Sequence, residues 1–190
     1  MKETVHLNKT FSKVIYTEES VQNREFENCT FIDCDLYGSD FSMSQFLDCT
    51  FKGCNLSMVK FNATSLKNVE FENCKMMGIA FEYCEDFLFE VKFDDCVLDF
   101  SSFANKKMQK TKFVKCSMQD VNFAGTNLLK AVFDDVNLNG ASFERTILTE
   151  ANLIKAYNFI IDPENNSVKK AKFSLKDAGG LLEKYDLKLV

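Results

Sequence analysis

The feature that most constrains this chain is a large apolar residue at every fifth position. Twelve such residues run from Phe26 to Phe81, and a second run begins at Leu88 and continues to Leu153. The position two before each of them is mostly Cys, Ser, Thr or Ala. A period of five fits neither an α-helix, with 3.6 residues per turn, nor a strand, with two. We therefore predict a chain that turns a corner every five residues, with one large and one small inward side chain on each side.

The cysteine spacing predicts how many corners close one turn. Five cysteines are separated by 20, 20, 22 and 20 residues: Cys34, Cys54, Cys74, Cys96 and Cys116. Four five-residue sides make a 20-residue coil, so these cysteines are expected to stack on one face of a four-sided solenoid. The interval of 22 falls where the large residues jump from Phe81 to Leu88, which predicts a two-residue insertion. From Phe51 onward Phe alternates with Leu or Met, and an inward Leu88 keeps that alternation.

The repeats resemble the pentapeptide-repeat family, whose pattern is a small residue, then Asp or Asn, then Leu or Phe, then two polar residues. Good matches are Cys54-Asn55-Leu56, Val121-Asn122-Phe123 and Ala151-Asn152-Leu153. The resemblance covers Arg24 to Ala156. It implies an all-β fold, a right-handed quadrilateral β-helix. About 26 repeats then give roughly 6.5 coils, spaced like neighbouring strands.

The tail resembles one branch of that family, which holds the microcin B17 immunity protein and the Qnr-type quinolone-resistance proteins. The segments that carry this resemblance are Asp162–Asn165, Lys170–Phe173 and Ala178–Leu182. Members of the branch act on DNA gyrase. The resemblance therefore implies a protein that protects a type II topoisomerase from an inhibitor, in part by presenting an acidic, DNA-like rod.

Three regions are expected along the chain: an N-terminal cap over 1–23, the β-helix over 24–158 with a small bulge at 82–87, and a C-terminal segment over 159–190. In the cap, Thr17 to Ser20 is predicted to open a helical turn. Phe11, Tyr16 and Val21 nevertheless keep the five-residue register, so a solenoid that starts before Phe26 stays open.

The C-terminal segment is predicted to form a hairpin around Pro163–Asn166, followed by a short α-helix from Ser174. Two interpretations of this helix stay open: it closes the last coil, or it pairs with a second copy in a two-fold homodimer. The candidate residues for either role are Leu175, Leu181, Leu182 and Tyr185.

The composition gives little support for catalysis. The chain has 1 His, and it lacks a glycine-rich phosphate loop and a nucleophile elbow. We predict a protein that is not an enzyme and uses no metal or cofactor. The 8 Cys follow the repeat, so they are expected to be reduced and buried, except Cys84 in the bulge. Without an export signal or a long apolar run, the expected location is the cytoplasm, with no membrane contact.

Three surface features are candidates for binding a protein partner, without direct contact to nucleic acid. Residues 25–100 hold 15 Asp or Glu against 5 Lys. The acidic candidates are Glu70, Glu72, Asp94 and Asp95. The bulge candidates are Glu82, Tyr83, Cys84, Glu85, Asp86, Phe87 and Phe89. The apolar strip candidates are Tyr37, Met58, Met77 and Phe100.

Two functions follow from these candidates. The first is a DNA mimic that binds DNA gyrase or topoisomerase IV and protects the enzyme from inhibitors, giving fluoroquinolone or toxin resistance. The second is an adaptor that binds another protein through the apolar strip or the bulge. A basic run from Lys106 to Lys115 departs from a uniformly acidic surface, and Lys106 occupies a nominally inward position where the coil must adjust.

Overall fold

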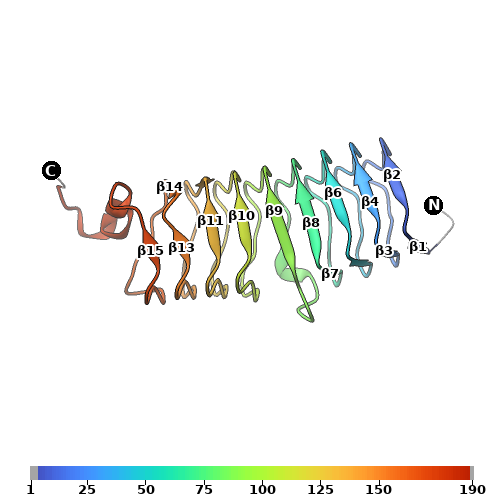
Figure 1. Ribbon diagram of the computed structural model, residues 1–190. Coiled ribbons are helices and arrows are strands. Elements are labelled where there is room, and N and C mark those ends of the chain that lie inside the picture. The colour runs from blue at the N-terminus through green and yellow to red at the C-terminus, as the bar shows by residue number, and fades with distance from the viewer. Residues whose placement is uncertain (1–3, 189–190) are drawn as a thin grey trace.

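Short parallel strands stacked into a rod make up the computed structural model, which describes residues 4–188 (Figure 1). The strands are β1 (Val5–Leu7), β2 (Thr10–Ser12), β3 (Glu25–Glu27), β4 (Thr30–Ile32), β5 (Gln45–Leu47), β6 (Thr50–Lys52), β7 (Ser65–Lys67), β8 (Val69–Glu72), β9 (Val91–Asp94), β10 (Lys112–Val114), β11 (Val132–Asp134), β12 (Val136–Asn137), β13 (Asn152–Leu153), β14 (Ala156–Tyr157) and β15 (Lys172–Phe173). Three short 3-10 helices complete the fold: η1 (Phe81–Tyr83), η2 (Ala178–Leu181) and η3 (Glu183–Tyr185).

The register of the strands confirms the four-sided coil. One side is the sheet β1-β3-β5-β7, and the next is a nine-stranded sheet that runs from β2 to β15. Phe31 pairs with Phe51, 20 residues on, whereas Phe71 pairs with Phe93, 22 residues on. The other two sides are joined by isolated parallel bridges such as Asp35 to Asn55 and Asp40 to Lys60.

A residue with positive φ at almost every fifth position makes the corners. Asn28, Asp33 and Asp48 have φ of 51–52°, and Gly53 has 63°. Asn, Asp and Gly adopt this left-handed conformation most readily, because a short polar side chain or none relieves the clash with the backbone. The corners therefore need few Gly and almost no Pro, which explains how a β-rich chain is built with 7 Gly and 1 Pro.

Columns of stacked rings fill the interior. Phe31 and Phe51 lie 4.5 Å apart between ring centroids at 7°, and Phe81 and Phe103 lie 4.6 Å apart at 5°. Fully buried Leu and Met, such as Leu56, occupy the other two sides, so the predicted alternation is confirmed except at Leu88, which is exposed. Each fully buried Phe contributes about 1.5–3 kcal/mol through the hydrophobic effect.

The N-terminal segment is a coil of the solenoid. Val5 pairs with Glu25 in β1 and β3, and Phe11 pairs with Phe31 in β2 and β4. The helical turn predicted for Thr17–Ser20 is wrong, since Glu18 is a corner residue with φ of 57°. Its N–H donates to the carbonyl of Tyr37 at 2.7 Å, so pairing with the next coil replaces a local helical bond.

The C-terminal segment also continues the solenoid. The predicted hairpin is wrong, because β15 pairs in parallel with β13, Asn152 opposite Lys172. The predicted α-helix is replaced by η2 and η3, where Gly180 lies so close to the Phe159 carbonyl that a side chain would collide with it. The nine strands of the long sheet, from Phe11 to Phe173, span eight turns rather than the roughly 6.5 predicted, or about 38 Å.

Candidate functional site

The single interruption of the stacked coils described here lies between η1 and β9, where a loop leaves the lower edge of the rod in Figure 1. The coil keeps its register through Glu85, whose N–H donates to the Thr64 carbonyl at 2.9 Å. It regains the register at Glu90, whose N–H donates to the Leu66 carbonyl at 3.0 Å. The chain therefore departs at residues 86–89, called loop 86–89 below, which is narrower and later than the predicted bulge at 82–87.

Three side chains in or near this loop take positions opposite to those predicted, since Leu88 was expected inside and Phe89 and Cys84 outside. Leu88 is 63% exposed and has a φ of 58°, so it is not an inward residue, and half-buried Phe89 packs against the core instead. Cys84 is 5% exposed, because it occupies the small inward position 20 residues after Thr64. Burial raises the pKa of the Cys84 thiol to about 12, so the thiol is protonated at neutral pH.

Lys106 holds loop 86–89 against the rod. Its side chain is 2% exposed, and its Nζ donates to the Cys84 carbonyl oxygen and to Asp86 Oδ1, both at 2.6 Å. The same ammonium lies 4.8 Å from the centre of the Phe89 ring. Thr126 takes the equivalent position in the next coil and donates its hydroxyl to the Phe103 carbonyl. In the sequence, Lys106 stands out as a charged residue at an inward position that is otherwise small. The sequence did not show that its partners are the Cys84 carbonyl and Asp86.

Several of the predicted bulge residues gather on the outside of the rod. Tyr83, Phe87 and Leu88 are exposed, and Phe87 is 71% exposed with the Lys67 ammonium 5.1 Å from its ring centre. Phe87 and Glu85 border a shallow groove of about 390 Å³, which Met43 lines on the other side. Glu82 is half-buried in η1. The loop thus displays large apolar side chains beside carboxylates.

The apolar strip candidates lie along one side of the rod in consecutive coils. Tyr37, Met58 and Phe100 are exposed, and Met77 is half-buried. The sulfur of Met58 lies over Gly78, where a side chain on residue 78 would collide with it. The strip therefore offers a narrow row of flexible and aromatic side chains.

Part of the acidic candidate surface is neutralised within the rod. Glu70 Oε1 lies 2.6 Å from Lys92 Nζ, and Glu72 Oε2 lies 3.0 Å from Lys52 Nζ. Both pairs join neighbouring coils, 22 and 20 residues apart, so the repeat spacing was the signal that predicts them. Asp94 and Asp95 are exposed. These two carboxylates are the stronger candidates for contact with a cationic partner.

The tail covers the last coil. Leu181 packs against the core, the Tyr185 hydroxyl donates to Glu164 Oε1 at 2.7 Å, and Lys184 Nζ lies 2.7 Å from Asp162. Lys184 also lowers the pKa of the Asp162 carboxyl through its hydrogen bond. Leu175 is 96% exposed and Leu182 is at the surface, so a homodimer through this segment stays a prediction.

No helix among residues 4–188 has the length and apolar character needed to cross a membrane. In the same range, no three His, Cys, Asp or Glu side chains converge as a metal site would require.

Comparison with known protein families identifies the repeat region. A family model described as "Pentapeptide repeat region" matches residues 24–86, and one described as "Pentapeptide repeats (8 copies)" matches residues 116–154. No curated protein sequence matches the chain.

Two similar solved structures cover nearly the whole chain. The first is a trypsin-treated variant of QnrB1, described as a plasmid-mediated fluoroquinolone resistance protein. It is 22% identical, with a TM-score of 0.57, over 98% of this chain and 97% of the other. The second is HetL, a pentapeptide repeat protein involved in heterocyst differentiation regulation from the cyanobacterium Nostoc sp. strain PCC 7120. It is 13% identical, with a TM-score of 0.51, over 92% of this chain and 90% of the other. At these identities the likeness shows the fold.

Proposed function

Because this chain belongs to the pentapeptide-repeat proteins, we propose that it is a non-enzymatic protein that binds DNA gyrase or topoisomerase IV in the cytoplasm. Bound there, it protects the enzyme from an inhibitor, either a fluoroquinolone or a toxin. The family resemblance of the tail supports this partner, as does the likeness along the whole chain to QnrB1, a fluoroquinolone resistance protein.

The observation that carries the proposal is a stiff rod whose residues 25–100 hold 15 Asp or Glu against 5 Lys. Proteins that bind DNA neutralise its phosphates with rows of Lys and Arg. Carboxylates of neighbouring coils stack directly at Glu72 and Asp94, whereas Asp40 and Glu70 lie opposite lysines. The coil spacing of about 4.8 Å is wider than the axial spacing of about 3.4 Å between phosphates along one DNA strand. Asp94 and Asp95 are exposed and available to such a row of cations.

A supercoiling assay with the host's own gyrase tests the proposal. We expect increasing amounts of the protein to restore supercoiling in the presence of a fluoroquinolone. Asp94→Lys combined with Asp95→Lys should weaken this rescue, because the reversed charges repel the cationic groove. If the protein neither restores nor inhibits supercoiling at any concentration, the proposed topoisomerase function is ruled out.

The second candidate function is an adaptor for another protein, and the exposed apolar side chains favour it. Phe87 and Leu88 on loop 86–89, with Met58 and Phe100 on the strip, present apolar surface that an acidic DNA mimic does not need. A pull-down from host lysate with wild type, Met58→Lys and Phe87→Lys tests it. Capture of one partner that is lost in a variant and is insensitive to salt supports the adaptor, whereas equal capture by all three proteins opposes it.

A further inference from the structure

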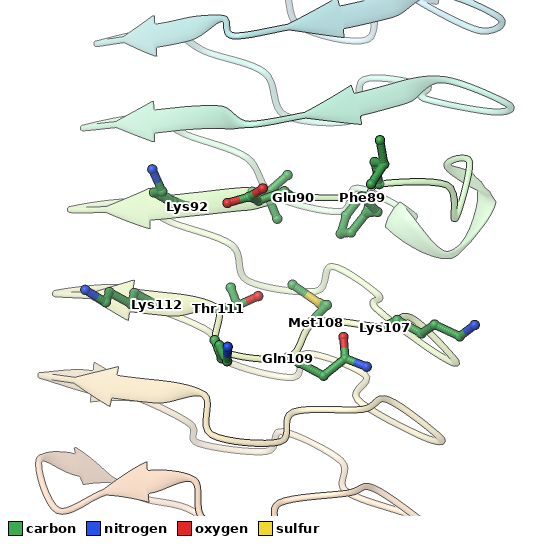
Figure 2. A pocket seen from close by; sticks show the side chains of 11 residues that line it. Phe89, Glu90, Lys92, Lys107, Met108, Gln109, Thr111 and Lys112 are labelled. Atoms are coloured by element: carbon green, nitrogen blue, oxygen red, sulfur yellow. The ribbon is translucent and has the colours of Figure 1, made fainter.

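A groove lined by lysines lies on the C-terminal side of loop 86–89. Figure 2 shows its two walls: Phe89, Glu90 and Lys92 on one coil, and Lys107, Met108, Gln109, Thr111 and Lys112 on the next. Its volume is about 570 Å³. We call it the lysine groove.

The lysine groove exists because loop 86–89 interrupts the ladder between coils. The sheet β1-β3-β5-β7 ends at β7, since the next segment leaves the rod as the loop. Beyond the loop, Lys107 bridges to Asn127, and the Asn127 N–H donates to the Lys106 carbonyl at 2.8 Å. Within residues 4–188, no backbone hydrogen bond joins Lys107 to the loop. The backbone of Lys107 is therefore bridged on the side of Asn127 and has no backbone partner in the loop.

The charges around the groove are mostly positive. Lys107, Lys110 and Lys112 are exposed, and in the described part of the chain none of them forms an ion pair. Lys92 is already paired with Glu70, and Glu90 is the one carboxylate that lines this groove. Three cations against one anion favour a ligand with negative charge.

Part of the groove is apolar. Half-buried Phe89 lies at the end beside Lys107, and Met108 and Val91 are buried directly beneath the surface. A polyanion without apolar groups, such as a phosphate backbone, makes no use of this apolar part. The neighbouring residues 25–100, with 15 Asp or Glu against 5 Lys, also repel a long nucleic acid more strongly than a short segment.

We propose that the lysine groove binds a short, extended acidic peptide segment of a protein partner. Its carboxylates lie against Lys107, Lys110 and Lys112, and one apolar side chain packs on Met108 and Phe89. Its backbone adds beside the backbone of Lys107, as in other cases where a peptide extends a sheet. This site goes beyond the proposed function, because it is basic and recognises a different chemistry from the acidic surface that would bind a topoisomerase.

Fluorescence anisotropy with a labelled acidic peptide, Glu-Asp-Leu-Phe-Asp-Glu, tests the proposal. Two other probes accompany it: a basic peptide, Lys-Asn-Leu-Phe-Asn-Lys, and a ten-nucleotide oligothymidylate. The full-length protein is compared with the variant Lys107→Glu/Lys112→Glu. The matched control is Lys169→Glu/Lys170→Glu, which makes the same charge change on exposed lysines of another coil. Far-ultraviolet circular dichroism checks that both variants keep the fold.

We expect the acidic peptide to bind the wild type and the control, and to lose about ten-fold or more in affinity with the groove variant. Its binding should shift the NMR signals of the Lys107 amide and the Met108 methyl group. Three results would overturn the proposal: no binding of the acidic peptide, equal loss in both variants, or tighter binding of the oligothymidylate. None of them bears on the supercoiling assay, which probes the acidic surface.

Discussion

The Lys106 side chain connects two neighbouring coils at loop 86–89, where elsewhere in the rod backbone hydrogen bonds connect them. At the equivalent position in the next coil, the Thr126 hydroxyl donates to the Phe103 carbonyl. The longer Lys106 side chain instead donates to the Cys84 carbonyl and to Asp86. A buried ammonium is costly unless it is paired and hydrogen-bonded. Asp86 is 65% exposed, yet it is the carboxylate that compensates this charge. The stability of the loop therefore depends on an exposed residue.

We expect Asp86→Ala to lower the free energy of unfolding by about 1.5–3 kcal/mol, because it leaves the Lys106 ammonium without its charged partner. Lys106→Thr should cost less than about 1 kcal/mol, since the threonine can bind a carbonyl as Thr126 does. The double variant should resemble Lys106→Thr alone. Urea denaturation measures all three, with Asp94→Ala as the exposed control. An Asp86→Ala protein as stable as wild type would contradict this account.

Burial should make the cysteines unreactive in the folded protein. All eight are free and buried, and burial raises the pKa of Cys49, Cys84 and Cys116 from 9.0 to about 12. Ellman's reagent at pH 8 should therefore label none of them rapidly in the native state, and all eight in guanidinium chloride. One thiol that reacts within the mixing time in the wild type and is missing in Cys84→Ala would show that Cys84 is exposed, as the sequence alone suggested.

The raised pKa values of these three thiols contribute a pH dependence of stability whose sign can be worked out. In the unfolded chain these thiols ionise near pH 9.0, whereas in the fold they stay protonated to about pH 12. Between these values the unfolded state binds fewer protons, so stability falls as the pH rises. The urea midpoint should be lower at pH 10.5 than at pH 8. A Cys49→Ala/Cys116→Ala variant should show a smaller decrease, and an equal decrease would assign the effect to other groups.

At the scale of elements, the sequence predicts the features that recur in every coil and misses the details of loop 86–89, which occurs once. The Cys spacing and the Phe alternation placed the four sides and the two-residue insertion, because every coil repeats that information. The exact loop depends on which side chain fills the interior at one level. There the Lys106 ammonium lies over the Phe89 ring, and Leu88 is exposed. The Glu72–Lys52 pair, by contrast, was readable from its 20-residue spacing.

Loop 86–89 is an insertion in an otherwise regular series of coils. Removing Asp86 and Phe87 returns Leu88 to the five-residue register, between Leu66 and Met108 on its side. Combined with Lys106→Thr, this deletion should give a regular coil whose melting temperature is equal to or higher than that of wild type, by circular dichroism. A melting temperature lower by more than about 5 °C would mean that the loop stabilises the fold.

The same deletion separates fold from function. If loop 86–89 contacts the topoisomerase, the deleted protein should keep its stability and lose rescue of supercoiling. Unchanged rescue would leave the acidic surface as the contact.

At the scale of the whole molecule, the rod holds its charges at fixed positions because each coil is hydrogen-bonded to the next. The acidic residues 25–100 lie N-terminal to a basic stretch that includes Lys107, Lys110, Lys112 and Lys115, and loop 86–89 lies near their boundary. A DNA-like surface would therefore occupy one half of the rod rather than its whole length. Because the acidic residues are concentrated in one half, recognition by a local acidic face can be distinguished experimentally from attraction by the net charge of −5 on the whole chain.

Binding to gyrase should therefore respond to where charge is reversed. Asp94→Lys/Asp95→Lys should weaken binding about ten-fold or more, whereas Asp135→Lys/Glu144→Lys, with the same change in net charge on exposed residues of the other half, should have little effect. Wild-type affinity should also fall steeply as salt is raised, because exposed charges are screened. Surface plasmon resonance at several salt concentrations measures both. Equal weakening by the two variants would assign the attraction to net charge, and salt-independent binding would assign it to the apolar strip.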